Sequence, residues 1–555
     1  MIARLAVAGA VVGLVGVTSC LAGAQAVSFD PAVSHELAQP YYSGAIVPTP
    51  RQVEYRDEYV LLIDGPKAVK HCAVQVEYGG AAQGLAARLL AERLEKYEAR
   101  YPDGATSTTA VEMIIPVVVA LADEPWLTRY VLAERAQALQ PQGYLLEVRP
   151  DAIVCLGKDN AGVVNAVASL LQLMHVRDGR LVVRCASVRD WPTFVVRYTA
   201  EYHLPGPDFF DWMMRYKING FGACYPGMRW EGLTDAKREG LKAIGAYIRQ
   251  YQTMHFLVEF HVGGRAGRPV DCGNPDDVAT LLDTIRETMT LTPTQHVMIC
   301  YDDVKPELQL EELGQFESPA HAHGHLMQRV YEAVKAKSGD TMVSFCTPFY
   351  QGRQHRRWRS DNLRSKGLAY LATVGAWENE DIVVVWTGPV TESRHISLED
   401  ISSYRDWLGS DRPLFYWDNT WHYHQPMRNF HAQYPEAFVD HCAGRSSYIN
   451  VNGVKPIGRF FAATANDYYW NPGAFDPKRA RRHAVAQFMG PQAVPATEAF
   501  YDLRGDDYFV FFARDVDLEA FDKAVAAIEK TSLDPELAAH CRAVYEGVAK
   551  KRRAQ

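Results

Sequence analysis

The chain has 555 residues, which is too long for one ordinary domain and predicts two or three. Its content of 48% hydrophobic and 22% charged residues is typical of a well-packed globular protein. A net charge of −8 gives no electrostatic reason to expect nucleic acid or an anionic membrane surface as a partner.

The first residues have the pattern of an export signal. Arg4 precedes a short apolar run at positions 5–17, and small residues follow. Because the run is too short for a membrane span, residues 1–26 predict a bacterial signal peptide and an exported protein, either periplasmic or extracellular. The residues ending at Cys20 also resemble a lipobox, which would lipidate Cys20 and anchor the protein at the cell envelope; cleavage beyond Cys20 is the alternative. No other segment is apolar enough to span a bilayer.

Nine of the ten cysteines lie beyond this signal, with no CxxC pair and no regular spacing. Neither a zinc site nor a disulfide framework is expected from such a pattern. Cys155, Cys300 and Cys346 each lie within an apolar run, so they are predicted to be small buried hydrophobic residues.

Residues 45–190 predict a small α+β domain with a mostly exposed sheet face. The expected strands are at 59–63, 113–121, 144–148, 153–156 and 181–183, and the expected amphipathic helices are at 81–97 and 161–174.

Residues 191–476 show a different pattern, in which short β-rich runs alternate with longer helical stretches. The β-rich runs are 194–203, 218–225, 255–262, 296–303, 342–350, 381–388, 412–419 and 447–453. Helix-like stretches include 209–217, 236–251, 276–288, 323–337 and 399–408. Eight strands alternating with helices over about 250 residues predict an α/β fold of the (β/α)8 TIM-barrel type. Residues 477–555 look helical and predict a separate α-helical module.

Polar and aromatic residues follow several predicted barrel strands at the point where each strand ends. In such barrels the functional site lies at the C-terminal ends of the strands. The residues there are Tyr301, Asp302 and Asp303 on the fourth strand, Phe349 and Tyr350 on the fifth, Trp386 and Thr387 on the sixth, and Trp417, Asp418 and Asn419 on the seventh. Carboxylates, hydroxyls, an amide and aromatic rings at one rim suit sugar recognition combined with acid/base chemistry.

Asp302 and Asp303 are adjacent, which constrains what they can do. On a regular strand their side chains would point to opposite faces, so both reach one pocket only where the strand breaks, as Pro306 favours. Two neighbours cannot easily flank a glycosidic bond as the carboxylates of an ordinary retaining glycosidase do. The pair therefore favours a substrate-assisted reaction, in which the 2-acetamido oxygen of the sugar attacks the anomeric carbon. An N-cap or a solvated loop is the alternative.

Four stretches in this order resemble glycoside hydrolase family 84, the β-N-acetylglucosaminidase, O-GlcNAc-hydrolase and hyaluronidase-like group. They are CYDDV at 300–304, VWTGP at 385–389, YWDN at 416–419 and TANDYYWNP at 464–472. The resemblance implies a retaining β-N-acetylhexosaminidase that acts on a glycan or glycoconjugate and needs no cofactor or metal. It implies that Asp302 orients the acetamide and that Asp303 is the general acid/base. The substrate-binding residues that it implies are Tyr350, Thr387, Trp417, Asn419 and either Asn450 or Asn452.

The sequence departs from the family pattern at sugar-binding positions. The segment Tyr225–Met228 lacks the lysine that the family carries after its second strand, and His424 stands where the family has Asp. The usual EGFYG of the first strand is also changed beyond Glu201. These departures predict a retained mechanism with altered selectivity, for a 4-epimer or a substituted N-acetylhexosamine. The alternative is a catalytically silent or weak carbohydrate-binding homologue on the same barrel.

Three further groups have a functional and an ordinary interpretation. His321, His323 and His325 could suggest a metal-dependent hydrolase, but residues i and i+2 of a helix start point to different sides. Glu259 and His261 end the third strand and are either pocket residues or core. A basic loop beginning at Arg353 is either a solvated face or a site for an acidic substrate.

Overall fold

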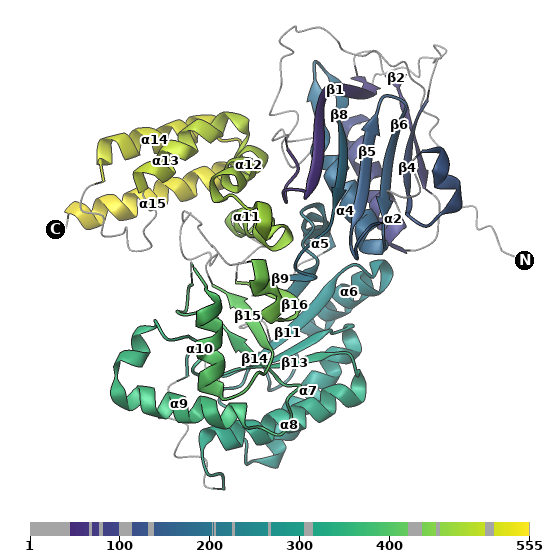
Figure 1. Ribbon diagram of the computed structural model, residues 1–555. Helices are drawn as coiled ribbons and strands as arrows, with labels where there is room; N and C mark the ends of the chain where they lie inside the picture. The colour runs from purple at the N-terminus through teal and green to yellow at the C-terminus, as the bar shows by residue number, and fades with distance from the viewer. Residues whose placement is uncertain are drawn as a thin grey trace, which may run out of the picture. The chain divides into compact units, whose positions relative to one another are not determined.

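The structure is a computed structural model (Figure 1) that describes residues 45–553 except 66–68, 77–80, 99–113, 131–137, 202–203, 205–206, 225–227, 265–267, 305–314, 394, 420–435, 451–455 and 505–515. The predicted signal peptide with Cys20, and the candidate residues His424 and Asn452, lie outside the described residues. Within the described ranges, no helix is both long and apolar enough to cross a membrane. The chain divides into two compact units, Pro50–Trp191 and Pro192–Gln555, and Val47–Thr49 belong with the second.

The first unit is built on one mixed sheet with the strand order β2-β1-β8-β5-β6-β4-β3, and β7 pairs with β8 (Figure 1). The strands are β1 (Gln52–Asp64), β2 (Val69–Lys70), β3 (Cys72–Val76), β4 (Ile115–Leu121), β5 (Tyr144–Arg149), β6 (Ala152–Gly157), β7 (Met174–Arg177) and β8 (Arg180–Asp190). The helices are α2 (Ala81–Glu98) and α4 (Asn160–Leu173), with the short turn η2 (Pro125–Arg129). Asp159 caps α4, because its side chain accepts a hydrogen bond from the Gly162 N–H at 2.9 Å.

The prediction of a mostly exposed sheet face is wrong for the central strands. Every residue of β6 is buried, and alternate residues of β4 and β6 form an apolar cluster with Leu127 and Leu139. Trp126 and Tyr130, at the two ends of η2, pack against this cluster. A short turn therefore covers the face that the sequence pattern left open, because its aromatic side chains are large enough to exclude water from several strand positions.

The second unit contains a closed barrel of eight parallel strands in the order β10-β11-β12-β13-β14-β15-β16-β9. The strands are β9 (Val196–Glu201), β10 (Gly220–Ala223), β11 (His255–His261), β12 (His296–Cys300), β13 (Met342–Cys346), β14 (Val383–Trp386), β15 (Leu414–Asp418) and β16 (Cys442–Ile449). The predicted (β/α)8 barrel is thus confirmed. Nearly every residue of its strands is buried, because the barrel interior covers one face of each strand and the surrounding helices cover the other.

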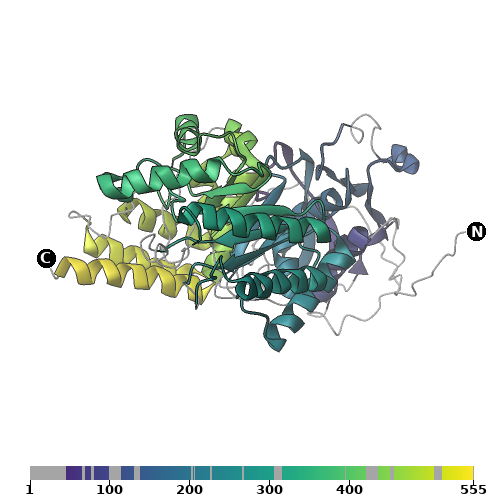
Figure 2. The ribbon, with the colours of Figure 1, turned by 90° about the horizontal axis from the view of Figure 1, so that it is seen from below.

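Helices lie around the outside of the barrel, as two views at right angles show (Figures 1 and 2). They are α5 (Pro207–Arg215), α6 (Asp235–Tyr251), α7 (Pro275–Leu291), α8 (Pro319–Lys337), α9 (Asp361–Gly375) and α10 (Leu398–Leu408). Thr234, Asn274, Ser318 and Ser397 cap α6, α7, α8 and α10 through hydrogen bonds to backbone N–H groups of the first turn. Each cap satisfies a donor that the helix leaves unpaired, and so fixes where the helix begins.

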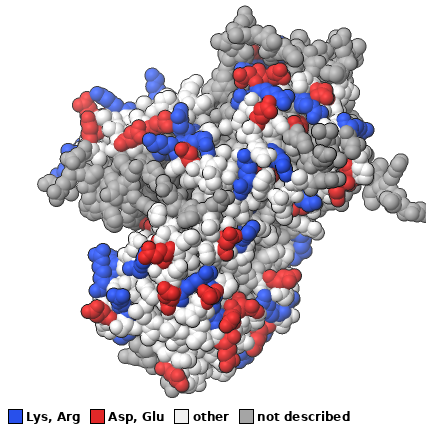
Figure 3. Space-filling model, viewed as in Figure 1, with Lys and Arg blue, Asp and Glu red and all other residues white. Residues whose placement is uncertain are grey.

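The helical region after the barrel belongs to the same compact unit as the barrel. Its helices are α11 (Pro456–Trp470), α12 (Pro477–Met489), α13 (Val494–Arg504), α14 (Leu518–Thr531) and α15 (Pro535–Arg553). The end of α11 is joined to the strand that opens the barrel, because the N–H groups of Thr193 and Phe194 donate to Trp470 and Tyr469. On the described part of the face in Figure 3, acidic and basic side chains are interspersed, in keeping with the small net charge.

Two buried histidines lead us to expect that acid destabilises the barrel. The Nε2 atom of His296 lies 2.6 Å from Ser344 Oγ, and the ring of His323 stacks on Tyr301 at 3.7 Å. Burial lowers the pKa of each to about 3. In the unfolded chain both titrate near pH 6.5, so stability is full above pH 6.5 and falls as the pH drops toward 3.

The loss should reach about 1.4 kcal/mol per histidine for each pH unit below 6.5, and urea unfolding at several pH values would measure it. We expect a weaker pH dependence in His296→Gln and His323→Gln, whereas the half-exposed His321→Gln should behave as wild type. An unchanged pH dependence in both buried-site variants would contradict the expectation.

Candidate active site

The two adjacent carboxylates lie where β12 has ended. The strand stops at Cys300, and the turn that follows contains Asp303 in the left-handed backbone region, with φ of 56°. Asp302 is buried, with 6% exposure, whereas Asp303 is exposed. The break predicted from the sequence is therefore present, and it gives two neighbouring carboxylates different environments. Left-handed backbone is tolerated by Asp better than by most residues other than glycine.

Asp303 is held at the rim by the tyrosine that follows β13. The Tyr350 hydroxyl donates a hydrogen bond of 2.8 Å to Asp303 Oδ1. Burial, together with the negative charges of Asp303 and Asp302, raises the pKa of Tyr350 well above its usual value. Tyr350 therefore remains a neutral phenol and a hydrogen-bond donor at any physiological pH.

Asp302 is connected to a chain of buried side chains that begins on two other strands. Its Oδ1 lies 3.1 Å from Nδ1 of His261, and Nε2 of His261 lies 2.6 Å from Glu259 Oε1. The Tyr448 hydroxyl donates to Glu259 Oε2 at 2.9 Å. From the sequence, Glu259 and His261 could be either pocket residues or core residues. In the structure both are buried, and both are members of the chain that leads to Asp302. Tyr448 was missed, although it lies on a barrel strand.

The amide residues of the rim pair with each other. The Asn450 side chain donates to Asn419 Oδ1 at 2.7 Å, and the Asn419 side chain donates to the Thr391 carbonyl at 3.0 Å. The ends of β15 and β16 are joined by a further bond of 2.9 Å from the Asn450 N–H to the Asp418 carbonyl. These bonds fix both amide planes at one side of the rim.

Trp417 and Tyr350 belong to one buried cluster inside the barrel that also contains Tyr448. The Trp417 ring meets Tyr448 edge-on at 5.2 Å, and its indole N–H is buried without a hydrogen-bond partner among the described residues. A buried N–H donor without a partner is costly and favours a ligand oxygen nearby. The Thr387 N–H donates to the Tyr350 carbonyl at 3.1 Å, and Thr387 Oγ1 donates to the Val390 carbonyl at 3.0 Å.

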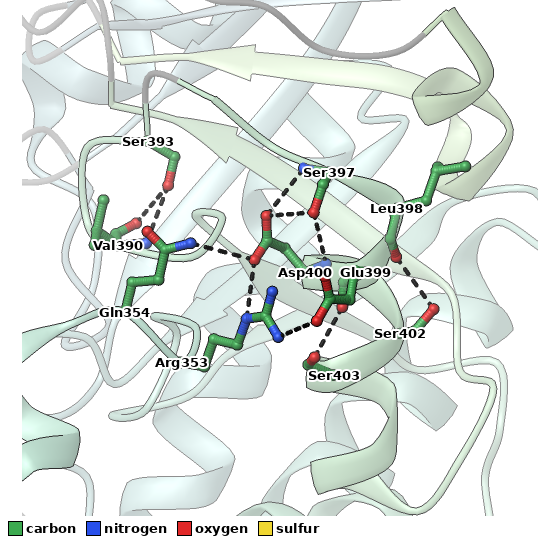
Figure 4. Close-up of polar contacts among 10 residues, drawn as sticks. All are labelled: Arg353, Gln354, Val390, Ser393, Ser397, Leu398, Glu399, Asp400, Ser402 and Ser403. Atoms are coloured by element: carbon green, nitrogen blue, oxygen red, sulfur yellow. Dashed lines mark hydrogen bonds and ion pairs between the residues drawn. The ribbon is translucent and has the colours of Figure 1, made fainter.

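Arg353 does not offer a free positive charge to a substrate. Its Nη1 lies 2.6 Å from Glu399 Oε1, and its Nε lies 3.2 Å from Asp400 Oδ1 (Figure 4). Asp400 also accepts hydrogen bonds from the N–H and hydroxyl of Ser397, at 2.9 and 2.8 Å. The network ties the loop after Tyr350 to the start of α10. Backbone bonds from Gly352 to Gly388 and from Gln354 to Pro389 support the same junction.

We expect Arg353→Met to loosen this junction. Because Asp400 is almost buried and Arg353 is partly so, the loss in the free energy of unfolding should be about 0.5–1 kcal/mol, at the upper end for a surface ion pair. Urea unfolding and the rate of proteolysis within residues 351–359 would measure it. The matched control is Arg356→Met, an exposed arginine of the same loop. Equal behaviour of the two variants would show that the ion pairs contribute nothing.

The three histidines at the start of α8 face different neighbours. His321 contacts Ser318, His323 is buried against Tyr301, and His325 packs on Phe316. The described residues contain two other groups whose ligand atoms lie within 4.8 Å of one another, Glu259 with His261 and Cys300, and Cys300 with Asp302 and Cys346.

Neither of these two groups fits a metal ion well. Both nitrogens of His261 already face carboxylates. Burial raises the pKa of Cys346 to about 12 and that of Cys300 well above its usual value, which disfavours the thiolate that a metal needs. All nine described cysteines are free and buried, in agreement with the prediction for Cys155, Cys300 and Cys346.

Comparisons with known families agree with the two-unit architecture. The β-N-acetylglucosaminidase family matches residues 229–502, which include every described rim residue from Asp302 to Asn450. Domain 2 of glycosyl hydrolase family 20 matches residues 44–191, the region of the first unit. No curated protein matches the sequence significantly.

Solved structures show the same fold at low sequence identity. The chain is similar to CpGH84B at 15% identity with a TM-score of 0.62, over 92% of this chain and 89% of that chain. It is similar to CpGH84D at 13% identity with a TM-score of 0.56, over 92% of both chains. The family 20 exo β-N-acetylglucosaminidase of Vibrio harveyi, solved with N-acetylglucosamine, aligns at 15% identity with a TM-score of 0.51, over 82% of this chain and 78% of that chain.

The carboxylates at the rim of the barrel and the two family matches indicate the same class of enzyme. Asp302 and Asp303 fall within the β-N-acetylglucosaminidase match, and the preceding unit matches a domain that belongs to another glycoside hydrolase family. The protein is therefore a glycosidase of the β-N-acetylhexosaminidase group.

Proposed function

We propose that this glycosidase is a retaining enzyme of glycoside hydrolase family 84, which removes terminal β-linked N-acetylhexosamine by a substrate-assisted mechanism. The observation that carries the proposal is the different surroundings of two adjacent carboxylates. Asp302 is buried, with its Oδ1 3.1 Å from His261 Nδ1, whereas Asp303 is exposed and accepts a hydrogen bond from Tyr350. Groups in such different environments suit different roles in one reaction.

Asp302 is the residue that orients the substrate's acetamide. Its carboxylate, fixed by His261, accepts a hydrogen bond from the acetamide N–H, which makes the acetamide oxygen more nucleophilic. That oxygen forms a bond to the anomeric carbon as the bond to the leaving oxygen breaks, and the product is an oxazoline. The positive charge that develops on the acetamide is stabilised by the nearby carboxylate.

Asp303 is the general acid and then the general base. It donates a proton to the leaving oxygen in the first step. In the second step it takes a proton from the water that attacks the anomeric carbon, while the bond from that carbon to the oxazoline oxygen breaks and the acetamide is restored. An exposed carboxyl group at the rim can reach both the leaving group and the incoming water. The hydrogen bond from Tyr350 holds Asp303 in place and is available to the acetamide oxygen as the oxazoline forms.

The remaining pocket residues bind the sugar. Thr387, Trp417 and Asn419 shape the acetyl pocket, and Asn450, whose side chain is paired with Asn419, binds the sugar. We also place Asn452 and His424 among the substrate-binding residues, on the sequence resemblance alone. The missing family lysine and the Asp-to-His change at 424 support altered selectivity, since a site that binds a hydroxyl discriminates strongly against analogues lacking it.

A panel of 4-nitrophenyl glycosides tests the function. It contains β-GlcNAc, β-GalNAc and the matching 2-hydroxy sugars, and NMR follows the anomer that is released first. Turnover confined to 2-acetamido sugars, with β-anomer released, supports the proposal and identifies the sugar. Binding of an acetamido sugar without turnover would favour the silent carbohydrate-binding homologue, and rapid cleavage of 2-hydroxy sugars would exclude the substrate-assisted mechanism.

We also propose that the protein is exported and lipid-anchored through Cys20, on the strength of the apolar run and the lipobox-like residues before it. Expression in a bacterial host with labelled palmitate should label the wild-type protein and leave Cys20→Ser unlabelled. Cys72→Ser is the matched control and should keep the label. Equal absence of label in all three proteins, with a mature N-terminus beyond Cys20, would indicate a cleaved, released protein.

A further inference from the structure

Four buried side chains form one chain of close polar contacts that ends on Asp302. Hydrogen bonds join Tyr448 to Glu259 and Glu259 to His261, and an ion-pair contact of 3.1 Å joins His261 to Asp302. The chain runs from Tyr448 on β16 to Glu259 and His261 on β11, and then to Asp302 beyond β12. Tyr448, Glu259 and His261 are 0%, 1% and 4% exposed. Burying a carboxylate or an imidazole costs free energy unless the group has a polar partner. The contacts of this chain therefore favour a single arrangement of the four side chains.

The distances within this chain limit which of its groups can carry a proton. His261 stands between two carboxyl oxygens, at 2.6 Å on the Nε2 side and 3.1 Å on the Nδ1 side. Each contact needs one proton, since a nitrogen lone pair facing a carboxylate oxygen would be repelled. With Glu259 ionised, either His261 is an imidazolium beside an ionised Asp302, or a neutral His261, protonated on Nε2, has its Nδ1 lone pair facing a protonated Asp302.

Glu259 decides between these two states. Its second oxygen accepts the Tyr448 hydroxyl, so both oxygens of Glu259 have a partner within the chain. An ionised Glu259 at 2.6 Å favours the imidazolium form of His261, and the imidazolium in turn favours an ionised Asp302.

We propose that Glu259 and His261 are positioning residues, which fix the orientation of the Asp302 carboxylate and keep it ionised, and that Tyr448 anchors Glu259. This inference rests on the proposed function, because Asp302 must be ionised to orient the acetamide. The structure also explains how Tyr448 reaches Glu259. Gly222 on β10 leaves the space, and a Cβ atom there would lie 2.4 Å from the Tyr448 ring.

Other titratable groups surround the chain and must be counted in any pH profile. They are Glu201 at the end of β9, Cys224 after β10, Cys300 of β12, Asp303, Cys346 of β13 and Tyr350. Burial raises the pKa of each of the three thiols, so they stay protonated in the range of interest. Glu201 and Asp303 are present in every variant below and do not alter the comparison.

Glu259→Gln removes the negative charge while keeping the shape. His261 then loses the partner that favours its cation and becomes neutral. Losing the imidazolium contact at 3.1 Å outweighs the loss of a more distant negative charge, so Asp302 is harder to ionise. The acidic limb of kcat/KM should move up by about one pH unit. A purely structural role would lower activity equally at every pH.

His261 allows the two contacts to be separated. The side-chain amide of Asn reaches the position of Nδ1, and that of Gln the position of Nε2. His261→Asn keeps a donor toward Asp302, and its kcat/KM at pH 7 should fall by about 10-fold. His261→Gln has no donor toward Asp302, and its kcat/KM should fall by about 100-fold. Tyr448→Phe should shift the acidic limb in the same direction as Glu259→Gln but by less.

The experiment measures kcat and KM from pH 4 to 9 for the wild type and each variant, with thermal melting as the folding control. Tyr198→Phe is the matched control, since it removes another buried tyrosine hydroxyl from the same cluster and should leave the pH profile unchanged. Unshifted profiles in Glu259→Gln and Tyr448→Phe, or equal losses in the two His261 variants, overturn the inference. A wild type inactive on every 2-acetamido sugar instead refutes the proposed function, and the two failures are therefore distinguishable.

Discussion

Asp303→Asn is expected to lower kcat/KM for substrates with poor leaving groups by about 10³-fold, because it removes the group that we propose protonates the leaving oxygen. The first step should remain nearly normal for a 2,4-dinitrophenyl glycoside, whose leaving group needs no proton. The amide keeps the size of the side chain and still accepts the 2.8 Å hydrogen bond from Tyr350, so the turn after β12 should be preserved. A series of aryl glycosides with graded leaving-group acidity would measure the effect.

The matched control for this substitution is Asp411→Asn, which changes an exposed carboxylate in the same way. It should leave every rate unchanged. A loss in Asp303→Asn that is the same for good and poor leaving groups would exclude Asp303 as the general acid.

Asp302→Asn is expected to lower kcat/KM by about 10²–10³-fold for all leaving groups alike, because in the proposed mechanism every substrate passes through the oxazoline. The neutral amide cannot stabilise the charge that develops on the acetamide. It also stands 3.1 Å from His261 without the negative charge that favours the imidazolium. Rates for acetamido and trifluoroacetamido sugars, compared in wild type and variant, would measure the effect.

The wild type should be much slower on the trifluoroacetamido sugar, whose oxygen is the weaker nucleophile. In Asp302→Asn both sugars should be slow. If the variant lost activity only on poor leaving groups, the roles of Asp302 and Asp303 would have to be exchanged.

The barrel could be predicted from sequence because its signal is local and repeated. Seven of the eight strands begin within about two residues of the predicted start. The exception is β16, which begins at Cys442 although residues 447–453 were expected. Gly444 and Arg445 have positive φ values of 58° and 46° and the register shifts there, so the early part of the strand lacks the usual alternation.

The first unit illustrates the opposite case. The strands β4 and β6 were expected, but the turn η2 that covers them has no periodic pattern that sequence could reveal. Its contribution comes from two aromatic rings packing on a distant sheet face. Such contacts depend on the tertiary fold and not on the local sequence.

Part of the candidate site was also predictable. Asp302 and Asp303 are adjacent and follow an apolar strand, so the break of the strand after Cys300 could be inferred, and the two carboxylates could be singled out as candidates. The contact between Glu259 and Tyr448 spans 189 residues and depends on closure of the barrel. One signal was available locally: residues two apart on a strand share a face, so Glu259 and His261 had to point the same way.

Gly222 has a consequence for how the sequences of related proteins should vary. A side chain at this position would clash with Tyr448, because a Cβ atom on residue 222 would lie 2.4 Å from a carbon of the tyrosine ring. We expect Gly222 to be replaced by a larger residue only in relatives that have replaced Tyr448 by a smaller one. Once Tyr448 has been replaced, a side chain at position 222 is tolerated. The two positions are therefore expected to vary together among relatives, and a glycine at 222 becomes a marker, legible without a structure, of homologues in which Glu259 is still anchored.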